Sequence, residues 1–112
     1  MSESQTSPTF TYAVERDGAT GTVVATGEID LASSNEFRTA NHGLIDDGAR
    51  DIVVDLTGVS FIDSSGLGVL VGSLKRIHEL GDDASLVLRG LGGAALGVFE
   101  ITGLDQVFVL TR

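Results

Sequence analysis

A short stretch in the middle of the chain, FIDSSGLGVL (61–70), combines hydroxyls and a carboxylate with a change of backbone pattern. Asp63, Ser64 and Ser65 stand between an apolar run and a segment with helical spacing. One serine is enough to cap such a helix, because its hydroxyl accepts from an early backbone N–H and contributes about 1 kcal/mol. The second serine and Asp63 exceed what capping requires.

The start of a helix also favours negative charge, since its free N–H groups and its dipole point at an anion. A phosphate on a serine at this junction would be tolerated by the fold. It would add about −1.5 to −2 charges to the surface. The junction therefore predicts a reversible modification site that changes binding without unfolding the domain.

Short β-prone runs and stretches with helical spacing alternate along the chain. The pattern predicts strands at 9–15, 22–26, 51–55, 85–88 and 106–110, with helices between Ser33 and Gly48, at 65–80 and at 94–102. Ser33 and Glu36 have the spacing of a capping box for the first helix. Residues 27–31, which precede that helix, are predicted to form a turn.

The order of these elements indicates the fold class. The pair Asp17-Gly18 joins the first two runs, which is typical of a hairpin. Strands and helices then alternate strictly, which favours crossovers between parallel strands. We predict an α/β fold with a mixed, mostly parallel sheet of about five strands and crossover helices. Residues 1–8 are expected to be a disordered lead-in and residues 9–112 a single domain.

Composition and charge exclude several classes of partner. The 112 residues carry a net charge of −9, which repels nucleic acid and anionic lipid. No apolar stretch approaches the ~18 residues that span a bilayer, and the polar N-terminus does not resemble a secretory signal. The chain has no cysteine. We expect a cytoplasmic protein that binds neither nucleic acid nor membrane.

Motifs for metals, cofactors and hydrolysis are absent from the sequence. His42 and His78 lack the helical spacing of a metal site, and both are expected to be exposed. Ile62 stands where a hydrolase elbow needs glycine. The glycines at 66–68 and at Gly72 fall within the predicted helix rather than in a phosphate loop. We therefore expect no metal, no cofactor and no enzymatic activity.

Gly68 and Gly72 lie on the outward face of the predicted helix, together with Lys75, Arg76 and Glu79. A glycine in a helix interior costs roughly 0.5–1 kcal/mol relative to alanine, so these positions call for an explanation. One explanation is close packing against a neighbouring element. The other is a smooth patch beside the serines on which another protein can lie. Both explanations stay open.

The stretch DLTGVSFIDSSGLGVL (55–70) resembles the signature of STAS-domain anti-anti-sigma factors, also called anti-sigma factor antagonists. TGEID (26–30) and FEITGLDQVF (99–108) resemble two further stretches of that family. The resemblance covers nearly the whole chain and implies a STAS-like fold. It also implies a bacterial partner-switching protein, whose unphosphorylated form binds an anti-sigma factor and so releases a sigma factor.

The resemblance implies roles for particular residues as well. The anti-sigma factor is expected to be an ATP-dependent serine kinase that phosphorylates Ser64 and thereby ends the complex. A metal-dependent serine phosphatase is expected to reverse the modification, and Ser65 would cap the helix. The partner-binding patch is expected to comprise Asp30, Asp63, Ser64, Ser65, Gly66, Gly68 and Gly72.

The chain departs from the family pattern in two places. Leu31-Ala32-Ser33-Ser34 follows Asp30 where many members have Thr-Ala, so the start of the first helix is expected to differ. The sequence stops at Arg112, so the family's C-terminal helix is expected to be short or missing. An uncovered sheet edge would favour a weak homodimer.

Two other functions stay open. One is a STAS scaffold subunit of a lipid-transport or stress-sensing assembly. The other is a small enzyme that uses Asp63 as a nucleophile.

Overall fold

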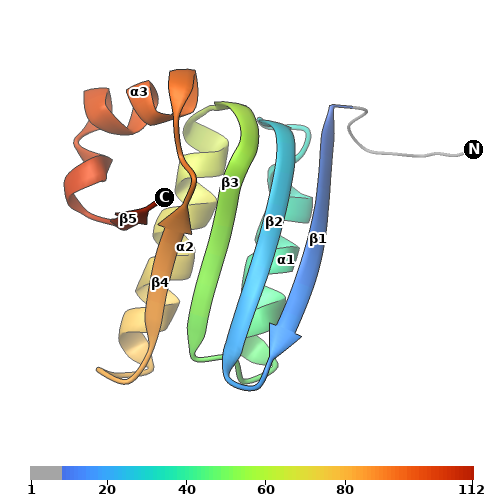
Figure 1. The fold of residues 1–112 in the computed structure, drawn as a ribbon, viewed down its shortest axis with the longest axis vertical. Helices are drawn as coiled ribbons and strands as arrows, with labels where there is room; N and C mark the ends of the chain where they lie inside the picture. Colours follow the sequence, from blue (N-terminus) through green and yellow to red (C-terminus); the bar gives the residue numbers. More distant parts are fainter. Residues whose placement is uncertain (1–8) are drawn as a thin grey trace, which may run out of the picture.

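Within residues 9–112, which the computed structural model describes, a five-stranded sheet carries two helices on one face and a third at one end (Figure 1). The predicted lead-in, residues 1–8, lies outside the described residues. The strands are β1 (Phe10–Asp17), β2 (Thr20–Ile29), β3 (Asp51–Ile62), β4 (Ser85–Arg89) and β5 (Val109–Thr111). The helices are α1 (Ser34–Asp46), α2 (Ser64–Glu79) and α3 (Gly93–Thr102), and a short 3-10 helix, η1 (Leu104–Gln106), precedes β5.

The order of strands in the sheet is the order in the chain, β1-β2-β3-β4-β5. β1 and β2 form an antiparallel hairpin, whose turn places Gly18 at a φ of 60°, a conformation that glycine adopts without a steric penalty. The pairs β2–β3, β3–β4 and β4–β5 are parallel. The predicted α/β fold with a hairpin and a mostly parallel sheet is therefore confirmed.

β2 and β3 extend well beyond the ends predicted for them. β2 continues through the predicted turn at 27–31 as far as Ile29, and β3 continues past Asp55 to Ile62. Both extensions contain glycine and polar residues, so the sequence there lacks the apolar pattern of a strand. Pairing between β2 and β3 makes up for the missing apolar pattern. Register shifts at 24–26 and 27–28 keep the ends of the two strands together.

The last strand is shorter than predicted. Residues 104–106 form η1, and β5 covers only Val109–Thr111 rather than 106–110. The ring of Phe108 packs edge-on against Phe99 of α3, with 5.9 Å between the ring centroids. Burial of this aromatic pair accounts for the turn before β5, because the chain must fold back from α3 to bring the two rings together.

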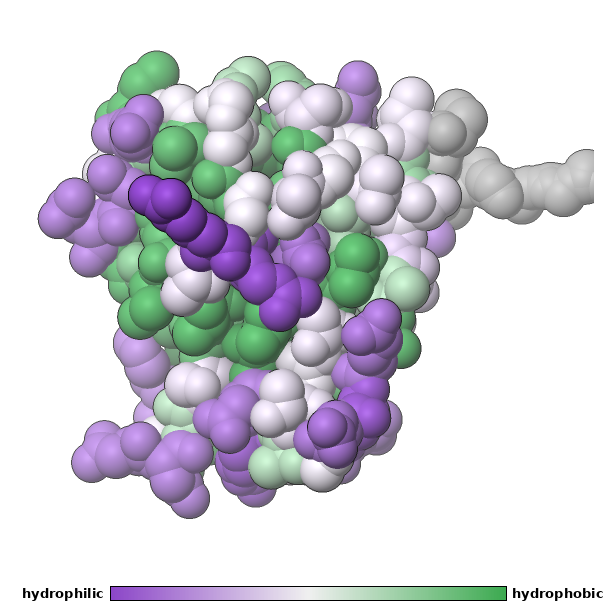
Figure 2. All heavy atoms as spheres, viewed as in Figure 1, coloured by the Kyte–Doolittle hydropathy of each residue, from purple (hydrophilic) through white to green (hydrophobic). Residues whose placement is uncertain are grey.

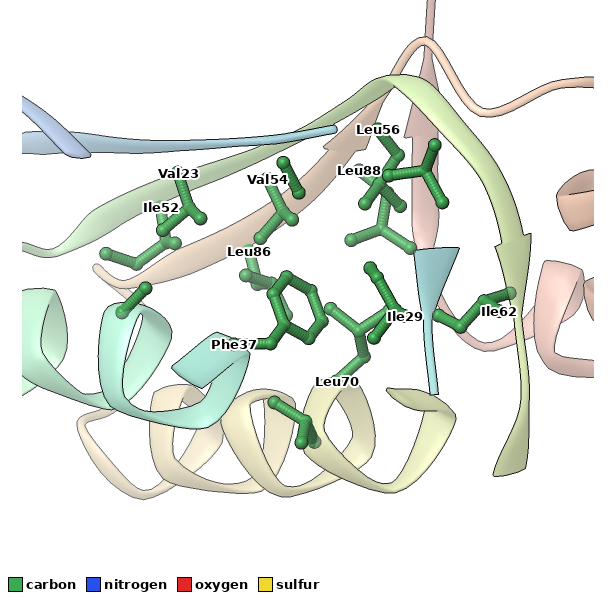
Figure 3. Close-up of a cluster of buried hydrophobic side chains, with 14 of the residues drawn as sticks. Val23, Ile29, Phe37, Ile52, Val54, Leu56, Ile62, Leu70, Leu86 and Leu88 are labelled. Carbon is green, nitrogen blue, oxygen red and sulfur yellow. The ribbon is translucent and has the colours of Figure 1, made fainter. Parts of the chain in front are cut away.

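The core lies between the sheet and the helices α1 and α2 (Figure 3). Phe37 of α1 and Leu70 of α2 point from the helices toward Ile52, Val54 and other sheet residues, and all of these are fully buried. Burial of each such side chain contributes about 1.5–3 kcal/mol. The alternation of buried and less buried residues along β2 and β3 follows from this one covered face.

The other face of the sheet is turned toward the viewer in Figure 1, while α1 and α2 lie behind it. Figure 2 shows that this face mixes hydrophobic and hydrophilic side chains. Asp55 and Arg89 pair on it, with 3.0 Å between Arg89 Nη2 and Asp55 Oδ2. Burial of Asp55 would raise the pKa of its carboxyl, but hydrogen bonds with Thr57 and Arg89 outweigh burial and hold that pKa below its usual value.

Candidate functional site

The candidate site lies at the edge of the sheet where the parallel strands end. Ile29 pairs with Ile62 at the last positions of β2 and β3, and Figure 3 shows both at one end of the core. The backbone N–H of Asp63 then donates to the carbonyl of Ile29 at 3.1 Å. The loop after β2 and the start of α2 therefore lie side by side.

Asp63, rather than a serine, caps α2. Its Oδ1 accepts from the backbone N–H groups of Ser65 at 2.8 Å and of Gly66 at 3.3 Å. The prediction that Ser65 caps the helix is therefore wrong. The extended backbone of Asp63, with φ −109° and ψ −172°, directs its carboxylate at these donors, and a negative charge also suits the helix dipole.

This cap decides how the two serines are presented. Ser64 is the first residue of α2 and is exposed, while Ser65 is half-buried. With Asp63 bonded to the helix N–H groups, the hydroxyl of Ser64 is not required to hold the first turn. The structure therefore places an exposed serine at the capped start of a helix.

Asp30 has a different task from Asp63. Its Oδ1 accepts from the backbone N–H groups of Ala32 at 3.0 Å and Ser33 at 3.2 Å, which closes a turn between β2 and α1. The hydroxyl of Ser33 donates to the carbonyl of Glu28 at 3.0 Å and accepts from the N–H of Asp30 at 2.9 Å. The predicted capping box is wrong in this respect, because Ser33 precedes α1 but its side chain makes no cap hydrogen bond.

The glycines of α2 separate into two kinds. A Cβ at Gly66 would lie 2.7 Å from side-chain carbons of both Ile29 and Ile62, so close packing requires glycine there. A Cβ at Gly68 would meet nothing within 4 Å, and one at Gly72 would meet only Nε2 of His42 at 3.9 Å. Packing within the described residues therefore explains Gly66 but not Gly68 or Gly72.

Arg76, one of the charged residues on the outward face of α2, forms an ion pair within the molecule. Arg76 Nη1 lies 2.6 Å from Oδ1 of Asp46, which ties α2 to the end of α1. Both side chains are well exposed, so the pair contributes little, about 0–1 kcal/mol. It lies toward the C-terminal end of α2, at the opposite end of the helix from Ser64.

The two histidines differ. His78 is exposed as predicted, but the prediction for His42 is wrong, because it is half-buried and its Nε2 is buried with no hydrogen-bond partner among the described residues. Burial lowers the pKa of His42, and the nearby charge of Arg76 lowers it further. The packing of α1 on α2 covers this ring, and no local pattern in the sequence indicates that contact.

Within residues 9–112, no group of three or more histidine, cysteine, aspartate or glutamate side chains is arranged to hold a metal ion. Over the same residues, none of the helices has the length and apolar character that crossing a membrane requires.

Comparison with known proteins identifies the family of this chain. A family model described as "Mlab, STAS domain" matches residues 12–111. The anti-sigma-B factor antagonist of Staphylococcus aureus is 40% identical over 81 residues, which are 72% of this chain and 73% of that protein. The chain belongs to the STAS-domain family of anti-sigma factor antagonists. Members of this family are regulatory proteins, so the hypothesis of an enzyme with Asp63 as its nucleophile is set aside.

Solved structures of STAS proteins share the fold. An anti-sigma factor antagonist from Mycobacterium paratuberculosis has a TM-score of 0.83 and 27% identity, and the match covers 96% of this chain and 91% of that one. The Bacillus cell fate determinant SpoIIAA in its phosphorylated form has a TM-score of 0.70 and 22% identity, over 91% of this chain and 92% of that one. The second likeness shows the fold alone.

Proposed function

We propose that this protein is an anti-sigma factor antagonist that works by partner switching. Its unphosphorylated form binds an anti-sigma factor with serine kinase activity, and phosphorylation of Ser64 ends that binding. The observation that carries the proposal is that, at the start of α2, one residue caps the helix and another is exposed. Asp63 caps the helix through Ser65 and Gly66, so exposed Ser64 can be modified without removing the cap.

The same cap suggests how a phosphate would act. The N–H groups of Ser65 and Gly66 already bond the carboxylate of Asp63. A phosphate on Ser64 would lie next to that carboxylate and would keep its charge toward solvent and partner. The phosphate would therefore weaken binding at the docking surface, because a buried charge or a contact between like charges at an interface can cost several kcal/mol.

The outward glycines support a docking role for this face of α2. Gly68 is exposed and has open space around its Cα, so a partner can approach the helix backbone closely. The proposed patch contains Asp63 and the first turn of α2 through Gly66, together with Gly68 and Gly72, with the Asp30 turn beside them. Within it, Gly66 and Asp30 act mainly by shaping the chain, because their contacts are internal.

The test is a phosphorylation assay with each purified kinase-type anti-sigma factor of the source organism. The parent chain should take up labelled phosphate from ATP, and Ser64→Ala should take up none. Ser65→Ala is the matched control and should remain a substrate. Label that is lost to hydroxylamine, or that persists in Ser64→Ala, would contradict phosphoserine at Ser64.

Further partners follow from this proposal. A serine phosphatase would restore the binding form, and the switch would operate in the cytoplasm without nucleic acid or membrane. A weak homodimer through an edge of the sheet stays a prediction. The alternative is a STAS scaffold subunit of a larger assembly, and the matching family model, whose description names a STAS domain only, agrees with either. A scaffold subunit would bind its assembly but would not be phosphorylated by an anti-sigma factor.

A further inference from the structure

Two large apolar side chains are exposed at the edge that carries Ser64. Leu31, directly after β2 and Asp30, is 79% exposed, and Phe61, near the end of β3, is 44% exposed. Phe61 precedes Ser64 by three residues and pairs across the sheet with Glu28. Both side chains therefore belong to the segments that meet at the candidate site.

Leu31 is held in solvent by a well-bonded turn. Asp30 accepts from Ala32 and Ser33 on the far side of Leu31, and fully buried Ser33 is bonded to both Glu28 and Asp30. The exposure of Leu31 is thus a property of a fixed backbone. A turn whose backbone is already fixed needs no ordering of its backbone on binding, which favours the use of Leu31 as an anchor.

The position of these side chains limits what can cover them. A kinase that transfers phosphate to Ser64 must bring its own surface against the residues next to that hydroxyl. Leu31 follows the end of β2 and Phe61 lies near the end of β3, and the bond from Asp63 to Ile29 joins these two segments just before Ser64. Exposed apolar residues with a polar surround are typical of protein–protein contacts, and a few such anchors carry most of the binding.

We propose that Leu31 and Phe61 are the apolar anchors by which this protein binds the anti-sigma factor, which presents a nonpolar recess to them. The inference rests on the proposed function and assigns the residues that supply affinity, as distinct from the one that is modified. It also gives phosphorylation a physical effect. A phosphate on Ser64 would have to lose water beside these apolar contacts, and that desolvation opposes the complex.

The experiment compares two pairs of exposed side chains. Leu31→Ser is matched by Ile101→Ser, because Ile101 is 88% exposed and belongs to α3, which lies on the other side of β3 from the Leu31 turn (Figure 1). Phe61→Ser is matched by Leu80→Ser, because Leu80 is 38% exposed at the opposite end of α2. Phe61→Leu is added as a milder change that retains an apolar group in the strand.

Each variant is titrated calorimetrically with the purified kinase-type anti-sigma factors of the source organism, and each is melted by circular dichroism. Leu31→Ser and Phe61→Ser should raise the Kd by about tenfold or more, with Phe61→Leu between them and the parent. The two controls should remain within about threefold of the parent, and the melting temperature of Leu31→Ser should be unchanged.

The outcomes separate this inference from the proposed function. A parent chain that binds none of these anti-sigma factors overturns both. A parent that binds, with Leu31→Ser and Phe61→Ser binding as tightly as the parent, overturns the anchors and leaves the proposed function standing. Controls that weaken binding as much as the anchor variants also overturn the inference, because the effect would then not belong to this edge.

Discussion

The helices α1 and α2 begin at the same edge of the sheet, and an aspartate and two serines stand before or within the start of each. Before α1, Asp30 closes the turn and Ser33 is buried with its hydroxyl bonded to the backbone of β2. Before α2, Asp63 bonds the helix and Ser64 is left exposed. The same residue types thus fix a turn at one helix and leave a serine exposed at the other, because Asp30 lies three residues before the N-cap of α1 whereas Asp63 is itself the N-cap of α2.

The largest expected effect concerns charge at the exposed serine. Ser64→Asp adds a negative charge at the proposed docking surface, whereas Ser64→Ala adds none. Like-charge or poorly solvated contacts at an interface can cost several kcal/mol, so Ser64→Asp should bind the anti-sigma factor far more weakly than Ser64→Ala. Calorimetric titration measures the difference. Both variants should melt near the parent temperature, and equal affinity in two folded variants would show that charge is not the switch.

The next largest effect is a difference between Ser33 and Ser64 in their contribution to the free energy of unfolding. Ser33→Ala should lower the free energy of unfolding by about 1–3 kcal/mol, because it removes the partner of the Asp30 N–H and bonds of a fully buried hydroxyl. Ser64→Ala should change it by less than about 0.5 kcal/mol, as for other exposed positions. Urea denaturation measures both. Equal losses of unfolding free energy would contradict a structural role for Ser33 that Ser64 does not share.

A smaller effect on stability, of opposite sign, is expected at Gly68. Gly68→Ala should raise the free energy of unfolding by about 0.5–1 kcal/mol, since alanine favours the helix and its Cβ meets nothing. Gly66→Ala should instead lower it, because its Cβ would lie 2.7 Å from Ile29 and Ile62. Gly68→Leu should weaken partner binding more than it changes stability. Unchanged affinity would leave Gly68 without a docking role.

The smallest effect concerns the contact between α1 and α2. The folded protein lowers the pKa of His42 below its usual value of 6.5, so the unfolded chain takes up the proton first as the pH falls. Stability should therefore be full above about pH 6.5 and should decline as the pH drops below it. Melting temperatures between pH 7 and pH 5 measure this slope. His42→Gln should flatten it, whereas His78→Gln, at an exposed position, should not.

Much of the fold could be predicted because local sequence patterns indicate most of its strands, helices and turns. Asp17-Gly18 indicated the hairpin, and the alternation of apolar runs indicated the parallel order. The ends of β2 and β3 could not be placed in this way. Their pairing depends on register shifts between segments more than thirty residues apart, which no local window contains.

The candidate site was predictable in its residue types but not in their roles. The motif placed Asp63, Ser64 and Ser65 at a helix start, but the hydrogen bonds of the folded chain are needed to show that Asp63 is the cap. Leu31 was noted as a departure in sequence, but its exposure follows from the turn that Asp30 and Ser33 form. The burial of His42 depends on how two helices pack, and that is tertiary information.

The order of strands has a consequence for how the chain acquires this structure. Because every strand pairs with the next strand in the chain, each loop that must close spans a single hairpin or a single crossover. Such a topology keeps the sequence separation between paired strands to one hairpin or one crossover, and the parallel crossovers remain its slowest pairings to form. A chain emerging from the ribosome therefore presents its strands in the same order in which they pair in the sheet.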